Sequence, residues 1–125
     1  MPQARLPLDS YPYQRDPRSR LIGIGLPDGP YVYVRDTAGF IHVVPDGPHL
    51  HPRVLGNAAP AWYAGDLTLA GDEVVDLTNL SGTFQFDDRE GLLDVARVLA
   101  ELGFEIRPNA VRFFPMDGSS PYILQ

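Results

Sequence analysis

Apolar and polar positions along this chain follow short runs that are separated by turn residues, which is the pattern of β-strands. Turn tetrads rich in proline, aspartate and glycine mark the ends of several runs, because these residues favour the backbone angles of tight turns. Gly71-Asp72 predicts a hairpin between two of the runs. The predicted strands are 21–26, 31–35, 40–44, 64–70, 73–78 and 83–86, with later ones at 110–114 and 122–124.

One helix is predicted, at about residues 88–102. Asp87 and Glu90 have the spacing of a capping box at its start, and Gly103 follows the last turn, where glycine often ends a helix. Its apolar residues recur at spacings of three and four and so form one stripe: Leu92, Val95, Ala96, Leu99 and Leu102. We therefore predict an α+β domain, a mostly antiparallel sheet of six to eight short strands with this helix packed on one face.

The length of 125 residues suits one domain. Residues 1–20 are rich in proline, arginine and tyrosine and show no periodicity, so we expect an extended arm, either loosely ordered or laid across the domain surface. Residues 21–125 form the predicted domain, in which 49–62 reads as a long irregular connection.

Composition excludes several classes of function. The chain has no cysteine, so it has no disulfide, thiol nucleophile or cysteine-ligated metal site. No run approaches the roughly 18 apolar residues of a membrane span, and the start lacks the apolar block of a signal peptide, so we expect a cytoplasmic protein that does not bind membranes. We also expect no cofactor.

Charge is distributed unevenly along the chain. Residues 1–62 carry six arginines and five aspartates, whereas residues 63–125 carry four arginines, seven aspartates and four glutamates. An acidic half argues against binding nucleic acid, which needs clustered positive charge. It suits a basic protein partner, because complementary charge speeds association and disfavours wrong partners. Ordinary solubilising charge is the alternative explanation.

Two groups of residues are candidates for a partner-binding surface. Amphipathic aromatic side chains are typical of protein interfaces, and several lie near predicted turns. The aromatic candidates are Tyr31, Tyr33, Trp62 and Tyr63. The acidic candidates, around the predicted hairpin and the helix start, are Asp72, Glu73, Asp76, Asp87, Asp88 and Glu90. The aromatic residues could instead pack beneath the arm, and the acidic ones could simply form a solvated face.

The histidines offer a different site. His49 and His51 would lie on the same side of an extended segment, and His42 is close in sequence, so a metal site is one interpretation. Local hydrogen bonding is the other, because no carboxylate follows in residues 52–56. A catalytic site would need His49 or His51 to meet Asp66 and Ser81, with Ser81 as nucleophile. Ser81 could equally stabilise its own turn.

The segment from His51 to Phe86 resembles a poorly characterised bacterial domain of polymorphic-toxin and secreted-effector systems. The resemblance rests on Ala64-Gly65-Asp66, which steps into a hairpin, and on Asn79-Leu80-Ser81-Gly82-Thr83-Phe84. Relatives have histidine and tyrosine where this chain has Thr83 and Phe84, so any chemistry of those two groups would be lost here. The resemblance implies a setting in toxin systems rather than a reaction.

These observations favour a non-catalytic protein-binding module, an immunity-type partner that blocks a bacterial toxin by steric and electrostatic contact. The first alternative is a small enzyme or a metal- or ligand-binding domain, with its site where the 49–51 loop meets Asp66 and the turn at 79–82. The second alternative is a subunit that self-associates as a homodimer through an exposed edge strand.

Overall fold

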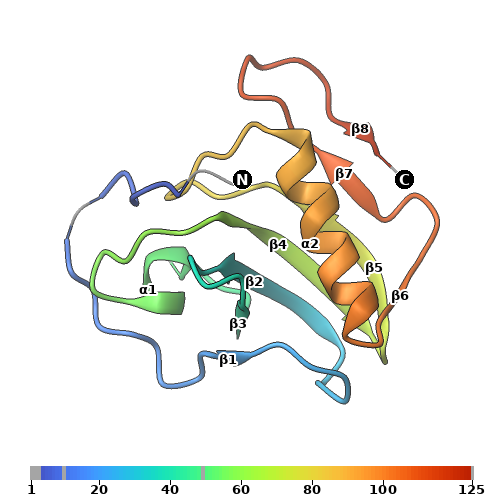
Figure 1. The fold of residues 1–125 in the computed structure, drawn as a ribbon, viewed down its shortest axis with the longest axis horizontal. Helices are drawn as coiled ribbons and strands as arrows, with labels where there is room; N and C mark the ends of the chain where they lie inside the picture. Colours follow the sequence, from blue (N-terminus) through green and yellow to red (C-terminus); the bar gives the residue numbers. More distant parts are fainter. Residues whose placement is uncertain (1–3, 10, 49, 125) are drawn as a thin grey trace.

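The computed structural model describes residues 4–9, 11–48 and 50–124, which form an α+β fold with a mostly antiparallel sheet (Figure 1). The strands of this part of the chain are β1 (Arg20–Leu21), β2 (Gly29–Arg35), β3 (Ile41–Pro45), β4 (Tyr63–Ala70), β5 (Glu73–Thr78), β6 (Glu105–Ile106), β7 (Val111–Phe113) and β8 (Tyr122–Ile123). The helices are α1 (His51–Leu55) and α2 (Arg89–Glu101). The predicted fold class is confirmed.

The sheet has the strand order β1-β3-β2-β4-β5-β7-β8, and β6 also pairs with β5. Pairing is antiparallel from β1 to β5. Short turns join β2 to β3 and β4 to β5, as antiparallel pairing allows. The chain then crosses through α2, so β6 and β7 return parallel to β5. The strand β8 pairs antiparallel with β7 at the end of the sheet.

The two helices lie on opposite faces of the sheet. Tyr63 points to the face of α2, where its ring lies against Gly91, and its hydroxyl donates to the Asp88 carbonyl at 2.8 Å. Asp66 is three residues further along β4 and so points to the other face, on which His51 begins α1. Because both faces are covered, the middle of β2 is buried on each side.

The helix α2 follows its predicted stripe at all but one position. Leu92, Val95, Ala96 and Leu99 are buried, whereas Leu102 is 45% exposed. The helix cap is Asp88 rather than the predicted Asp87, because the Asp88 carboxylate accepts from the Gly91 amide at 3.0 Å.

Three other local predictions are wrong. Residues 21–26 hold only the end of β1, because the chain turns at Ile24-Gly25, where Gly25 has φ of 90°. Residues 83–86 bury Phe84 and Phe86 without pairing as a strand. The connection at 49–62 contains the short helix α1, and Pro52 lies in its first turn, where proline is tolerated.

The described residues of the arm make backbone hydrogen bonds to several parts of the domain. Arg5 exchanges backbone hydrogen bonds with Ala61, each at 2.8 Å. Further backbone hydrogen bonds join the arm to the α1 region: the Asn57 amide donates to the Tyr13 carbonyl, and the Asp16 amide donates to the Arg53 carbonyl. The Leu8 amide donates to the Thr83 carbonyl in the loop after β5. The arm therefore borders the face of the sheet on which α1 lies.

Candidate functional site

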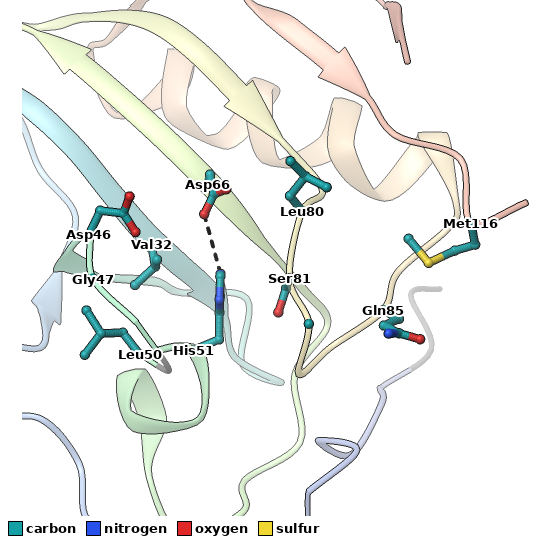
Figure 2. Close-up of a pocket in the computed structure, with 11 residues that line it drawn as sticks. Val32, Asp46, Gly47, Leu50, His51, Asp66, Leu80, Ser81, Gln85 and Met116 are labelled. Atoms are coloured by element: carbon teal, nitrogen blue, oxygen red, sulfur yellow. Dashed lines mark ion pairs between the residues drawn. The ribbon is translucent and has the colours of Figure 1, made fainter. Parts of the chain in front are cut away.

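A cavity of about 430 Å³ opens on the α1 face of the sheet, and Figure 2 shows the side chains around it. His51, Asp66 and Ser81, which sequence analysis groups as one alternative site, all line this cavity. Its other walls come from β2, the segment before α1, the loop after β5 and the segment after β7: Val32, Asp46, Gly47, Leu50, Leu80, Gly82, Gln85 and Met116.

His51 is positioned by the start of α1 and by one hydrogen bond to β4. Its Nε2 lies 2.8 Å from the carbonyl oxygen of Gly65. A carbonyl oxygen only accepts, so Nε2 carries the proton and donates. Burial lowers the pKa of His51, opposed in part by this hydrogen bond and by the Asp46 carboxylate. The ring is therefore neutral at pH 7, and its Nδ1 is an acceptor.

Asp66 is the carboxylate beside this histidine. Its Oδ1 lies 4.0 Å from His51 Nε2, and its side chain is 41% exposed (Figure 2). Partial burial raises the pKa of Asp66 to about 6, and the Asp46 and Asp76 carboxylates add to the rise by repelling its negative form. Asp66 is thus a carboxyl group that changes its protonation near neutral pH.

Asp66→Asn is expected to stabilise the fold at about pH 7.5 by up to about 1 kcal/mol, since solvent screening limits the effect of a partly exposed charge. The folded-state pKa of Asp66 lies above its unfolded value, so the folded state binds the proton more tightly and stability falls as pH rises through about 6. The gain should vanish near pH 4, where the wild-type carboxyl is protonated. Urea unfolding at both pH values measures this; an equal gain in the exposed control Glu90→Gln would contradict it.

Ser81 and Asn79 hold the loop that forms one wall of the cavity. Ser81 Oγ accepts from the Phe84 amide at 3.1 Å, and no hydrogen bond joins Ser81 to His51 in the described part of the chain. Asn79 is fully buried, and its Nδ2 donates to the carbonyls of Phe86 and Phe114 at 2.9 Å. Its Oδ1 accepts from the Phe114 amide at 2.7 Å. Both side chains therefore have structural partners.

His42 lies apart from this cavity, on another part of the sheet. His42 lies on β3, where its ring contacts Asp36 at 2.7 Å and Arg15 at 3.2 Å. His49 lies outside the described residues. The expected extended segment at 49–51 is wrong at its end, because Leu50 has helical angles and His51 begins α1. Among the residues that the structure describes, no group of three histidine or acidic side chains could hold a metal ion.

The predicted aromatic surface is wrong for its three tyrosines. Tyr31, Tyr33 and Tyr63 are at most 5% exposed, because they belong to the two central strands. Each hydroxyl donates to a backbone carbonyl, so burial leaves none of them without a hydrogen bond. Trp62 is half-buried and lies under the guanidinium of Arg35, 5.2 Å from the ring centre.

Most of the predicted acidic residues have partners within the chain. Glu73 pairs with Arg107, and Asp76 pairs with Arg112 at 2.7 Å. Asp87 forms an ion pair with Arg5 at 3.2 Å. Asp72 accepts a hydrogen bond from the Gly25 amide at 2.8 Å, and Asp88 accepts one from the Gly91 amide at 3.0 Å. Glu90 is exposed in the first turn of α2. Residues 72–76 and 87–88 therefore present less net charge than their sequence implies.

Several residues that line the cavity have no functional pattern in the sequence. Asp46 lies in a predicted turn and precedes His49 and His51, so it could join a site of histidine and aspartate only through the fold, and no motif assigns a function to Leu80, Gln85 or Met116. The one available signal is Asp46 itself, an acidic residue shortly before His51.

Comparison of the chain with models of protein families, with curated proteins and with solved structures finds no significant match. Neither helix in the described part of the chain has the length and apolarity needed to cross a membrane.

Proposed function

We propose that this chain is a non-catalytic binding domain that takes up a basic group of a protein partner in the cavity beside His51 and Asp66. One observation carries the proposal. Asp46 and Asp66 line the same cavity, and no arginine is among its lining residues. No arginine in the described part of the chain makes an ion pair with either carboxylate, whereas Glu73, Asp76 and Asp87 each pair with one.

The electrostatics of the cavity favour a cation. Asp46 raises the pKa of Asp66, so the two carboxylates oppose each other when both are charged. A guanidinium or ammonium group between them would replace this repulsion with two charge-assisted hydrogen bonds. Binding of a cation should therefore lower the pKa of Asp66. By the same linkage, protonation of Asp66 at low pH should weaken binding of the cation.

The walls suit the rest of an arginine or lysine side chain. Val32, Leu50 and Leu80 supply apolar surface, against which the aliphatic stem of such a side chain can pack. Ser81 and Gln85 add polar groups to the lining (Figure 2). A cavity of about 430 Å³ has room for one such side chain together with water.

The hydrogen bonds of the cavity favour binding over catalysis. His51 Nε2 donates to Gly65, and Ser81 Oγ accepts from Phe84, so the described residues contain no nucleophile paired with a base at this site. The pKa of Asp66, about 6, favours acid–base catalysis as a second candidate, because a catalytic acid or base works best near its own pKa.

The resemblance to a domain of toxin systems bears on the identity of the partner. On that basis the partner we propose is a bacterial toxin or effector with an exposed arginine or lysine. The chain would then act as an immunity-type protein that covers the basic surface of the toxin.

The test is an NMR titration of the isotope-labelled protein with the peptide acetyl-Ala-Arg-Ala-amide, and with the matched peptide in which uncharged citrulline replaces arginine. We expect saturable shifts at the amides of Asp46 and Asp66 with the arginine peptide alone at about pH 7.5. Affinity should fall several-fold at about pH 5, where Asp66 is protonated. Asp46→Asn with Asp66→Asn should abolish the shifts, and Glu90→Gln should preserve them.

Equal chemical-shift changes with both peptides, or no change with either peptide at a concentration of tens of millimolar, would contradict the proposed function. A catalytic site would instead alter the peptide, so new peptide resonances that depend on Asp66 would favour the second candidate.

A further inference from the structure

A second cavity, of about 470 Å³, lies on the α2 face of the sheet, beside the C-terminal half of α2. In Figure 1, α2 lies over β4 and β5 and does not extend over β1 and β3. One helix cannot cover so wide a sheet, so a hollow remains at its edge. The hollow is lined by Leu21, Ile22, Arg35, Ala38, Gly39, Phe40, Ile41, Trp62, Val98 and Leu102.

The walls of this cavity expose large apolar side chains. Phe40 is 59% exposed, Leu21 is 55% exposed and Leu102 is 45% exposed. They come from different elements and gather around one hollow, whereas apolar residues on a surface usually occur singly. An apolar body seated here would remove part of this surface from water, which is the main source of affinity for small ligands.

Arg35 gives the cavity its chemical preference, since it is the single charged residue among those that line it. Its Nε donates to the Gly39 carbonyl at 3.1 Å, and its guanidinium stacks on Trp62. Within the described part of the chain, no carboxylate lies at ion-pair distance from Arg35, although several other arginines have such partners. These two contacts hold the guanidinium in place, and no carboxylate of the described residues pairs with its terminal nitrogens.

We propose that this cavity binds a small carboxylate with an apolar body, such as a medium-chain fatty acid or an aromatic acid. The carboxylate pairs with Arg35, and the apolar body lies against Phe40, Leu102 and Trp62. A planar guanidinium that is already oriented matches a carboxylate in two parallel hydrogen bonds. The site is on the opposite face from the Asp46 and Asp66 cavity and has the opposite charge preference, so it stands independently of the proposed function.

The test uses Trp62, which is the one tryptophan of the chain and so reports binding by its own fluorescence. Decanoate is the probe, and decylammonium is the control with the same chain and the opposite charge. We expect a saturable change in emission with decanoate, with a Kd on the order of 100 µM. Decylammonium should bind this site at least about tenfold more weakly, because its charge opposes that of Arg35.

Variants distinguish recognition of the carboxylate charge from nonspecific hydrophobic binding. Arg35→Gln should weaken decanoate binding by about tenfold, Arg35→Lys should retain part of the affinity, and the exposed control Arg89→Gln should match the wild type. Phe40→Ser removes an exposed wall at little risk to folding, and should also weaken binding. Circular dichroism checks that each variant is folded.

Three results would overturn the proposal. The first is the absence of any saturable change with decanoate at millimolar concentration. The second is an equal affinity for decanoate and decylammonium, and the third is an Arg35→Gln affinity equal to that of Arg89→Gln; either of these would show that charge is not recognised.

Discussion

Gly65→Ala is expected to destabilise the fold by about 4 kcal/mol, enough to unfold a domain of ordinary stability in mild urea. A Cβ at this position would lie 1.9 Å from the carbonyl oxygen of Thr78 and 2.7 Å from its carbonyl carbon. Both contacts are with backbone, so relief requires β4 and β5 to separate. The hydroxyl of Tyr33, which donates to the same Thr78 oxygen at 2.8 Å, would also be displaced.

The matched control is Gly82→Ala in the neighbouring loop, where an added Cβ meets no atom within 4 Å. Its free energy of unfolding should stay within about 0.5 kcal/mol of the wild type. The pair therefore tests whether the close approach of β5 restricts position 65 to glycine while position 82 accepts a side chain. A Gly65→Ala protein as stable as Gly82→Ala would contradict the structure at this point.

Asn79→Ala is expected to lower the free energy of unfolding by about 3 kcal/mol. The side chain makes three hydrogen bonds to backbone, with Phe86 and Phe114, and is completely buried. Alanine would leave two carbonyls and one amide without these partners, and water could replace the bonds only by opening the core. Urea unfolding, followed by circular dichroism, measures the loss.

Gln85→Ala is the control for this second substitution, because Gln85 also carries an amide but is exposed. It should change stability by less than about 0.5 kcal/mol. Asn79→Asp adds a sharper comparison, since a buried carboxylate keeps an acceptor for the Phe114 amide but loses both donors. It should be at least as destabilising as alanine near pH 7 and less so in acid. Similar stability of Asn79→Ala and Gln85→Ala would show that the hydrogen bonds contribute little.

The parts of the fold that local pattern decides were predictable. The runs at 31–35, 64–70 and 73–78 became central strands, and the apolar stripe of α2 is buried except at Leu102. The run at 21–26 has the same apolar content, but two glycines within it allow a turn that composition alone does not reveal. Only Ile22 and Leu26 of that run are buried, whereas Leu21 and Ile24 are more than half exposed, so its apolar content predicts neither the strand nor complete burial.

The site could be predicted only in part, because its residues meet through long-range pairing. His51, Asp66 and Ser81 could be grouped from the sequence, but their roles depend on contacts outside their own segments. Asp46 becomes part of the cavity because the chain before α1 turns back toward β4, which no local pattern encodes. The burial of Tyr63 depends in the same way on a distant segment, the start of α2, where its ring lies against Gly91 and its hydroxyl donates to the Asp88 carbonyl.

The walls of the Asp46 and Asp66 cavity come from segments that are far apart in the chain, from Val32 on β2 to Met116 after β7. No contiguous part of the chain contains this site, so it exists only when the whole domain is folded. An occupant therefore stabilises every element at once, and slows hydrogen exchange of core amides on β4 and α2 as well as of amides beside it. If the proposed partner occupied this cavity, it would also protect the chain from proteolysis through the globally unfolded state and so prolong its lifetime in the cell.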